Sequence, residues 1–414
     1  MARVAITGAG IVSPLGNSLQ AFQRSLAQAR SGIRRLPEEL TQGSGVKVGA
    51  LVDWSPAPFF KDGEAANLDR VSQFALAASA QALEASGMDL ADADRSRIGV
   101  YWGTGMGGAH TLDASYKTVY GAGEWRLRPL AVVMAMNNAA GSNVAVRHGL
   151  GGPFANFSTA CSSSAMALGE AMRAVQAGRA DAMVAGGAEA LLTPGTLTAW
   201  QALRTLAPGD PHDPAASCKP FDQRRAGLVL GEGAAAFVLE EESRARARGA
   251  RILGFLTGYG NTCDAAHMSR PDRGGQTRAM REALADAGLR PKDIGYINAH
   301  GTATAVGDVV EADAINAVFQ DAEPLVSSTK SLHGHLLGGA GALELAVALL
   351  ALEQGVVAPT AFLEQPDPAI RLRHVALQAA RIDPPRAVMS NSFAFGGSNV
   401  VLVAEQNGDG PHFP

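Results

Sequence analysis

The sequence predicts a layered α/β fold built from two similar halves, and three observations support this prediction. At 414 residues, the chain exceeds the size that one hydrophobic core usually serves. Hydrophobic residues make up 47% of the chain but aromatic residues only 6%, and 48 residues are glycine, which indicates a core of small aliphatic side chains with close helix contacts. The third observation is a strand-turn-helix pattern that occurs twice.

The repeated pattern is F-S-T-A-C at 157–161 and V-S-S-T-K at 326–330. Each segment is followed by a small-residue helix that closes at a glycine, Gly178 in the first case and Gly355 in the second. Two copies of one α/β unit packed about a pseudo-dyad would explain the repeat. Chance similarity between two buried strand-helix units is the alternative.

In the first half, apolar strands alternate with helical patterns. Val4 to Thr7 predicts a strand, and the Gly8-Ala9-Gly10 turn after it lacks the third glycine of a dinucleotide-binding turn, so no nucleotide site is expected. Residues 68–85 repeat apolar positions at helical spacing, and Gly87 ends them. The other elements expected are helices at 19–28, 132–148 and 189–206, a helical region that ends at about 116, and strands at 46–52, 98–103 and 182–187.

The second half begins after a charged helix expected at 241–249, so the predicted halves are residues 1–249 and 250–408. Before that helix, prolines predict a surface loop at 208–220, and glycines separate two expected strands within 221–240. The remaining expectations are core strands at 294–299, 387–390 and 399–404, and a frayed polar tail after Gln406.

Charge and cysteine content exclude several classes of protein. The net charge of −4 makes nucleic acid an unexpected partner, and three cysteines are too few for a disulfide framework, which fits a reducing cytoplasm. The N-terminus has no signal-like apolar run, and no stretch approaches 18 uninterrupted apolar residues. We therefore expect a cytoplasmic protein that does not span a membrane.

Cys161 is the first candidate for chemistry. It should lie where a strand passes into a helix N-terminus, because small residues crowd the turn and a helical pattern follows. Free backbone N–H groups and the helix dipole there would favour the thiolate and would hold an oxyanion. The alternative is a small buried hydrophobe in a core turn.

Three further polar motifs follow apolar strands: N-A-H-G-T-A-T-A-V-G-D at 298–308, S-S-T-K-S-L-H-G-H at 327–335 and N-S-F-A-F-G-G-S-N at 391–399. A cysteine and two histidines that converge could run nucleophilic chemistry on a thioester. Each histidine alone is more often structural. The spacing His333-x-His335 could also suggest zinc, but no carboxylate or thiol lies at ligand spacing nearby, so no metal is expected.

In this order, the motifs closely resemble the β-ketoacyl-acyl-carrier-protein synthases of type II fatty acid synthesis, of the Cys-His-His or KAS I/II type, in the thiolase-like superfamily. The resemblance runs from I-T-G-A-G-I-V-S-P-L-G-N at 6–17 to F-G-G-S-N at 395–399. It implies a thiolase-like fold, with two duplicated α/β halves forming a five-layer α-β-α-β-α sandwich. It also implies an acyltransferase that joins malonyl-carrier protein to an acyl group by decarboxylative Claisen condensation, with no cofactor beyond the carrier's phosphopantetheine.

The resemblance also implies roles for individual residues. Cys161 takes the acyl chain, His300 and His335 bind the malonyl thioester carbonyl, and Lys330 supports them. Phe395 gates the acyl channel, and its N–H and that of Cys161 form the oxyanion hole. The remaining assignments are Asp308, Glu311 and Glu344 in the network around the lysine, Thr302 and Thr304 on the pantetheine arm, Met106 in an acyl pocket at the dimer interface, and Arg126, Arg128 and Arg204 at the carrier-protein dock. His333 falls where the family commonly has a small polar residue, so it is not made catalytic.

Five positions depart from the family pattern. Ala303 and Ala305 stand where Ser and Pro are more usual, Ala226 and Leu228 replace Asp and Phe, and Ala394 replaces Gly. They leave open whether the enzyme elongates primary fatty acids or serves a specialised polyketide or aryl polyene pathway. The alternatives in other classes are a non-catalytic subunit that shapes another ketosynthase's cavity, and a Cys-His hydrolase. The expected partners are acyl carrier protein and a second subunit, in a homodimer or in a heterodimer with a related ketosynthase.

Overall fold

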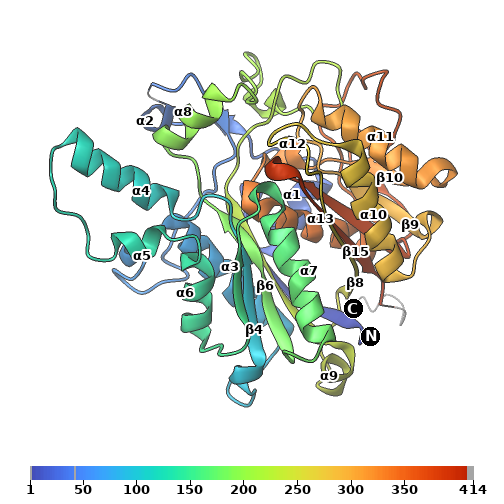
Figure 1. Ribbon diagram of the computed structural model, residues 1–414, viewed down its shortest axis with the longest axis horizontal. Coiled ribbons are helices and arrows are strands. Elements are labelled where there is room, and N and C mark those ends of the chain that lie inside the picture. The colour runs from blue at the N-terminus through green and yellow to red at the C-terminus, as the bar shows by residue number, and fades with distance from the viewer. Residues whose placement is uncertain (1, 42, 408–414) are drawn as a thin grey trace.

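Helices and sheets alternate in five layers, as the resemblance implies (Figure 1). The computed structural model describes residues 2–41 and 43–407, so most of the tail expected to fray lies outside the described residues. The strands are β1 (Val4–Val12), β2 (Arg34–Arg35), β3 (Val48–Gly49), β4 (Ile98–Gly103), β5 (Phe154–Phe157), β6 (Ala182–Glu189), β7 (Gly233–Glu241), β8 (Gly254–Cys263), β9 (Ile294–Asn298), β10 (Leu325–Ser327), β11 (Val356–Val357), β12 (Arg373–His374), β13 (Ala380–Arg381), β14 (Ala387–Phe393) and β15 (Ser398–Glu405). The α-helices are α1 (Leu19–Ala27), α2 (Glu38–Thr41), α3 (Arg70–Ser86), α4 (Ala109–Tyr116), α5 (Ala131–Ala135), α6 (Ala139–His148), α7 (Ser163–Gln176), α8 (Pro194–Ala202), α9 (Glu242–Ala247), α10 (Arg273–Ala287), α11 (Gly307–Phe319), α12 (Lys330–His333) and α13 (Ala340–Gln354).

The two halves of the chain form five-stranded arrays of the same topology. In the first half the strands lie in the order β5-β4-β6-β7-β1, and in the second half in the order β10-β9-β14-β15-β8, with β12 beyond β10. In each array three parallel strands are followed by two antiparallel ones. The strand order and the strand directions therefore repeat, which confirms the duplicated α/β fold.

A short antiparallel ladder between β1 and β8 joins the two arrays into one sheet. Val4 to Ile6 pair with Leu256 to Gly254, and the strands diverge beyond these residues. The charged helix expected at 241–249 is α9, in the connection from β7 to β8. The boundary between residues 249 and 250 stays a prediction.

Alternate residues of the strands face different cores, because successive side chains point to opposite faces of a sheet. Val238 of β7 packs in the outer core with α3, whereas Phe237 and Leu239 face the central core that α7 and α13 fill. In the second array, Val388 faces the central core and Met389 faces the outer core with α10 and α11. The order of layers is therefore α3, sheet, α7 with α13, sheet, α10 with α11.

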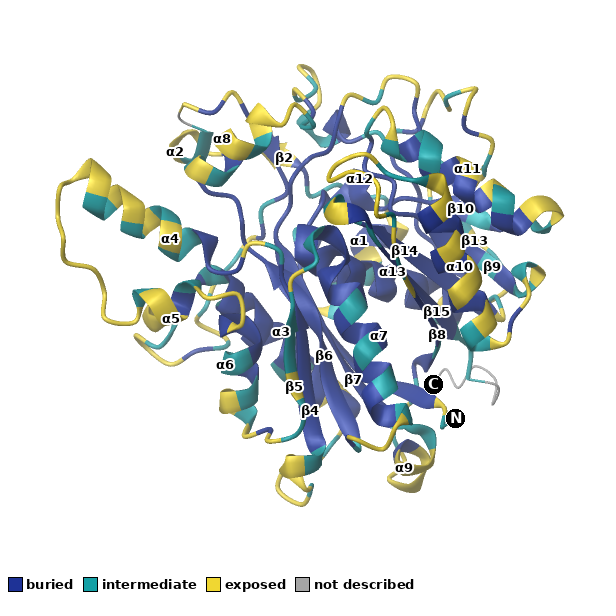
Figure 2. Ribbon diagram, viewed as in Figure 1, coloured by how far each residue is buried: buried dark blue, intermediate teal, exposed yellow. Residues whose placement is uncertain are grey.

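The central position of α13 explains its apolar sequence. Residues Leu337–Gln354 are the one segment of the described chain whose length and hydropathy would suit a membrane span, and 89% of this segment is buried inside the protein. Figure 2 shows α13 and α7 buried between the sheets, while α4 projects outward, and its residues beyond Ala109 are intermediate or exposed.

Several predicted elements differ from the observed ones. The helix expected at 132–148 is two helices, α5 and α6, because Met136 adopts an extended conformation (ψ 142°). The helix expected at 189–206 is only α8, since β6 continues to Glu189 and Thr193 caps a helix that begins at Pro194. Of the strand expected at 46–52, only β3 (Val48–Gly49) forms.

The two strands expected within 221–240 are a single strand, β7. The preceding residues Leu228 and Leu230 each form only an isolated bridge, Leu228 to Leu206 and Leu230 to His335.

The turn expected at Gly8-Ala9-Gly10 is wrong, because these residues continue β1 and pair with β7 after a register shift between Ile6 and Gly8. The remaining strands and α3 lie within a few residues of their predicted bounds, and α3 ends as expected at Gly87 in the left-handed conformation (φ 63°).

Candidate active site

Cys161 lies in a tight turn between β5 and α7, as the sequence predicts. A 3-10 turn over Ala160–Ser162 leads directly into the helix, and Ala160 has a positive φ of 51°. The hydroxyl of Ser163 accepts from the Thr159 N–H at 2.9 Å, which closes the turn. Gly103 of β4 packs closely against the start of α7. A Cβ atom added to Gly103 would lie only 2.3 Å from the backbone nitrogen of Ser164. Small residues are therefore required at this point.

Two groups lie within hydrogen-bonding distance of the Cys161 sulfur. The Nε2 atom of His335 lies 3.0 Å from Sγ, and the backbone N–H of Phe395 hydrogen-bonds the sulfur as well. Cys161 is only 5% exposed, and burial raises the pKa of its thiol to about 12, although Lys330 and the Phe395 N–H act in the opposite direction. Burial therefore acts against the expectation that this turn favours the thiolate, and it has the largest effect on the pKa of Cys161.

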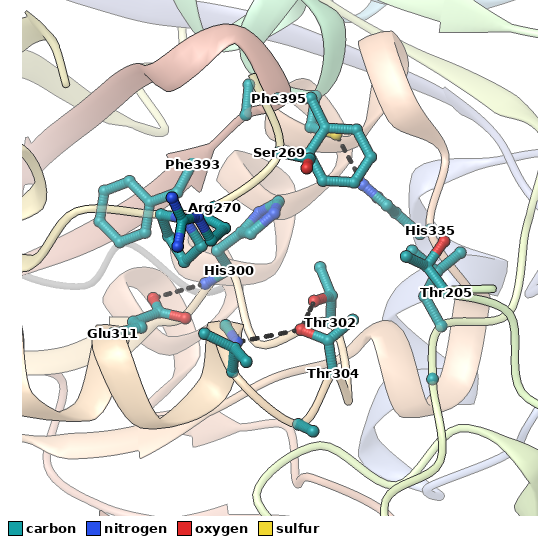
Figure 3. Close-up of a pocket in the computed structure, with 18 of the residues that line it drawn as sticks. Thr205, Ser269, Arg270, His300, Thr302, Thr304, Glu311, His335, Phe393 and Phe395 are labelled. Atoms are coloured by element: carbon teal, nitrogen blue, oxygen red, sulfur yellow. Dashed lines mark hydrogen bonds between the residues drawn. The ribbon is translucent and has the colours of Figure 1, made fainter. Parts of the chain in front are cut away.

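His300 follows β9 at the carboxyl end of the strand, and a buried carboxylate holds its backbone. Glu311 accepts the N–H groups of His300 at 2.8 Å and of Gly301 at 2.7 Å. The His300 ring lies edge-on to that of His335, with 5.3 Å between centroids (Figure 3). Burial, followed by the Lys330 charge, lowers the pKa of both imidazoles well below the ordinary value, so both rings are neutral at pH 7.

Lys330 begins α12, with two residues between it and the end of β10, and is completely buried beside His300. Its Nζ pairs with Glu344 of α13 and lies 3.4 Å from Nδ1 of His300. Burial raises the pKa of Glu344 to about 7, and Lys330 counteracts that rise. This contact orients the His300 ring, because Nδ1 of His300 faces the Lys330 ammonium group. The other ring nitrogen, Nε2, is then available to a ligand in the cavity.

The three acidic residues predicted around the lysine differ in their contacts. Glu344 contacts Lys330 directly, whereas Glu311 acts through the His300 backbone. Asp308 has no direct contact with Lys330 among the described residues: its Oδ2 accepts from the Phe221 N–H at 2.8 Å and lies 4.0 Å from Arg225. Its place in the network around the lysine stays a prediction.

A cavity of about 410 Å³ opens onto this group of residues. Cys161, His300 and His335 form part of its wall, and Phe395 stacks on Trp200 above the sulfur, with 5.9 Å between ring centroids. Thr302 and Thr304 also line the cavity, and their hydroxyls lie 3.1 Å apart (Figure 3). Arg204 also lines this cavity.

Three predicted site residues lie elsewhere. Met106 does not line this cavity; it is 40% exposed on the chain surface, and its N–H donates to Glu189. Arg126 and Arg128 line a separate cavity of about 380 Å³, and Arg128 donates to the carbonyl of Ala66. The roles assigned to these residues stay predictions.

Sequence reasoning missed Glu189, a fully buried carboxylate near the sulfur. Its oxygens accept from the N–H groups of Gly105, Met106 and Gly338 at 2.7 to 3.0 Å, and burial raises its pKa to about 7. It thus ties the glycine-rich turn of the first half to the second half. A glutamate at the end of an otherwise apolar strand is the signal that could have found it.

The cavity-lining segment 264–271 was also missed. Its Met268 carbonyl accepts from the Gly396 N–H at 2.7 Å, and the Asp264 N–H donates to the Gly397 carbonyl at 2.8 Å. The segment is therefore fastened to the turn that carries Phe395. Its polar, irregular sequence predicts only a loop, and nothing local indicates the contact.

The ligand atoms of Cys161, His300 and His335 lie within 4.8 Å of one another, so by composition these residues could hold a metal ion. The ammonium group of Lys330 beside them disfavours a second cation, and the expectation of no metal stays a prediction. His333 is turned away from this group, with its nitrogens bonded to Thr329 at 3.0 Å and to the Gly334 carbonyl at 2.7 Å. It is a structural histidine.

Comparison with known proteins agrees with this geometry. Residues 1–245 match the Beta-ketoacyl synthase N-terminal domain and residues 253–364 the corresponding C-terminal domain. The chain therefore belongs to the β-ketoacyl synthase family. It is 39% identical to 3-oxoacyl-[acyl-carrier-protein] synthase 2 of Staphylococcus aureus (strain N315), over 97% of both chains, and 40% identical to the protein of that name from Synechocystis, again over 97% of both.

Solved structures resemble the chain over nearly its whole length. A β-ketoacyl synthase from Burkholderia phymatum superposes with a TM-score of 0.91 at 34% identity, over 98% of this chain and 100% of that one. The ishigamide ketosynthase/chain length factor gives the same TM-score and coverage at 31% identity. The relatives thus include both a plain β-ketoacyl synthase and a ketosynthase described together with a chain length factor.

Proposed function

We propose that this chain is a β-ketoacyl-[acyl-carrier-protein] synthase, an acyltransferase that extends an acyl chain by two carbons. The observation that carries the proposal is the convergence of the Cys161 sulfur and the His300 and His335 imidazoles, from both halves of the chain, on one cavity. The relatives named 3-oxoacyl-[acyl-carrier-protein] synthase 2 support it.

The first half-reaction forms the acyl-enzyme. The Cys161 sulfur attacks the carbonyl carbon of the carrier-bound thioester, and its proton passes to Nε2 of His335, the nitrogen 3.0 Å away. The bond from that carbon to the pantetheine sulfur breaks, and His335 passes the proton to this sulfur, so that pantetheine leaves as a thiol and His335 is neutral again. The N–H groups of Phe395 and Cys161 hold the carbonyl oxygen while it carries negative charge.

The second half-reaction uses malonyl-carrier protein. Neutral His300 and His335 donate hydrogen bonds to its thioester carbonyl, so that loss of CO₂ leaves an enolate whose charge they stabilise. The enolate carbon attacks the acyl carbon on Cys161, the C–S bond breaks, and the sulfur leaves as a thiolate that takes up a proton from solvent. Lys330 holds His300 in place, and Thr302 and Thr304 bond the pantetheine arm.

Acyl carrier protein is the proposed partner, docked at Arg126, Arg128 and Arg204, and a second ketosynthase-like subunit completes the enzyme. A homodimer is proposed first. A neighbour described as a ketosynthase in complex with its chain length factor keeps the heterodimer as the alternative. No cofactor is proposed beyond the carrier's phosphopantetheine, and a cytoplasmic location is proposed with it.

Two pathways are candidates for the reaction of this enzyme. Some structural relatives are named for polyketide or ishigamide systems, so a specialised pathway is the second candidate beside primary fatty acid synthesis. A non-catalytic subunit is disfavoured, because the sulfur, both imidazoles and the buried Lys330 are intact and in contact.

The experiment that tests the proposal measures the mass of the intact protein. After incubation with acyl-carrier protein, Cys161 should gain the mass of the acyl group, and malonyl-carrier protein should then remove it. A protein that is never acylated, or that loses the acyl group to water without malonyl-carrier protein, would contradict the proposal and favour a partner subunit or a hydrolase.

A further inference from the structure

Three arginines line the cavity beside Cys161, and they differ in their partners. Arg225 is neutralised, since its Nη1 lies 2.7 Å from Asp367 and its other nitrogens donate to the carbonyls of Thr304 and Ala305. Arg204 and Arg270 are exposed, and within the described ranges neither forms an ion pair. Two uncompensated positive charges therefore face the cavity.

The carboxylates of the same wall do not neutralise them. Asp264 accepts from the Asn399 side chain at 2.6 Å and from the Asp272 N–H at 3.1 Å. Glu311 is engaged with the backbone of His300 and Gly301. Both carboxylates are thus held by neutral N–H donors and neither is paired with Arg204 or Arg270, so these two guanidinium groups are available to an anionic group of the substrate.

Hydrogen bonds fix the backbone of the segment that carries Arg270. Its own N–H donates to Nδ1 of His267 at 3.2 Å, and the neighbouring Met268 carbonyl is bonded to Gly396 beside the Phe395 turn. Figure 3 draws the Arg270 side chain among the lining residues, with His300, Phe393 and Thr302. The backbone of Arg270 is therefore fixed, while its guanidinium group forms no ion pair with any residue that the structure describes. Such a group is suited to a planar, bidentate contact with an oxyanion of the substrate.

We propose that Arg270 binds the phosphodiester of the phosphopantetheine arm and so positions the thioester for attack. The inference rests on the proposed function, which supplies that arm. The thioester must reach the buried sulfur, so the phosphodiester at the other end of the arm remains towards the exposed rim where Arg270 lies. The malonyl carboxylate is a poorer partner, because an ion pair with it would stabilise the ground state and slow the loss of CO₂.

The test compares three acyl donors that carry the same acyl group: acyl-carrier protein, acyl-phosphopantetheine and acyl-pantetheine, which lacks the phosphate. Arg270→Ala should raise KM for the first two about five- to tenfold and leave KM for acyl-pantetheine unchanged. Arg270→Lys should recover part of the loss, since it keeps the charge but not the bidentate geometry. The matched control is Arg273→Ala, an exposed arginine three residues further on that does not line the cavity.

An equal effect on all three donors, or none on any, would overturn the proposal, and so would an effect confined to malonyl donors, which would assign Arg270 to the carboxylate. Charge reversal of Arg126 and Arg128 separates the phosphate contact from carrier docking, because it should affect the carrier-bound donor alone. Acylation of Cys161 in the wild-type protein is read in the same assay, so a failure of the proposed function appears separately, as absent acylation with every donor.

Discussion

The Nε2 atom of His335 lies 3.0 Å from the Sγ atom of Cys161, although 174 residues separate the two in the sequence. His300 lies beside the pair but contacts Lys330 instead, through Nδ1 at 3.4 Å. The two imidazoles therefore have different neighbours, which gives them separable roles. A thiol whose pKa is raised to about 12 needs a base to lose its proton at pH 7, and His335 is the base in contact with it.

The first prediction separates the two histidines. His335→Ala should slow acylation of Cys161 by about 10² to 10⁴, the usual range for a lost general base. His300→Ala should be acylated nearly as fast as the wild type but should fail to decarboxylate malonyl-carrier protein. Rapid-quench mass spectrometry of the acyl-enzyme and CO₂ release measure the two steps. An acylation defect in His300→Ala together with normal decarboxylation would reverse the assignment.

The second prediction concerns the buried ion pair. Glu344→Ala leaves the Lys330 ammonium uncompensated in the core, so it should lower the free energy of unfolding by about 3 to 5 kcal/mol. The matched control is Glu353→Ala on the same helix. Its partner Arg251 is 72% exposed, so the loss should stay below about 1 kcal/mol. Urea denaturation compares the two, and equal losses would show that Lys330 does not depend on Glu344.

The third prediction is a pH dependence of stability. Burial raises the pKa of Asp308 from 3.8 to about 7, so between those values the folded state holds a proton that the unfolded chain has lost. The contribution of Asp308 to stability is full below about pH 4 and is lost as the pH rises through 7. Asp308→Asn is neutral throughout and keeps an acceptor for the Phe221 N–H.

The stability of Asp308→Asn relative to the wild type should therefore increase from pH 5 to pH 8, as measured by urea denaturation at both values. A constant or decreasing difference would mean that Asp308 is ionised in the folded protein at pH 5. In that case the Arg225 guanidinium, 4.0 Å away, would be stabilising its charge.

The fourth prediction concerns chain length. Met106 is exposed on the single chain, so it can line an acyl pocket only where a second subunit covers it. Met106→Gly should then extend the accepted acyl chain by several carbons, each buried methylene adding up to about 0.8 kcal/mol of binding, and Met106→Trp should shorten it. The product profile measures both variants, in protein verified to be folded and dimeric. A profile unmoved by either substitution would refute the assignment.

Local sequence was sufficient where the chemistry depends on short motifs. The turn at Cys161 needs small residues and a following helix, both visible in the sequence, and the duplicated strand-turn-helix pattern correctly predicted a repeated topology. The break between α5 and α6 was not predictable in the same way, because apolar periodicity continues through Met136 while the backbone there is extended.

Contacts between distant parts of the chain determine the features that local sequence did not predict. The helix N-terminus at Cys161 suggested a thiolate, but the burial that raises its pKa comes from segments far along the chain. Asp308 stands in a motif with catalytic neighbours, yet its contacts go to Phe221 and Arg225, which no spacing in that motif indicates. Contacts between distant segments, such as Met268 with Gly396, leave no local pattern at all.

The central claim is that Cys161 carries an acyl group to which a decarboxylated malonyl unit is joined. It is tested most directly by incubating the protein with acyl- and malonyl-carrier protein and measuring both CO₂ and the mass of the carrier-bound product. The account predicts a β-ketoacyl product two carbons longer than the acyl donor, with one CO₂ released for each product, and no such product from folded Cys161→Ala. The elongated product from Cys161→Ala, or CO₂ and free acid from the wild type without elongation, would contradict it.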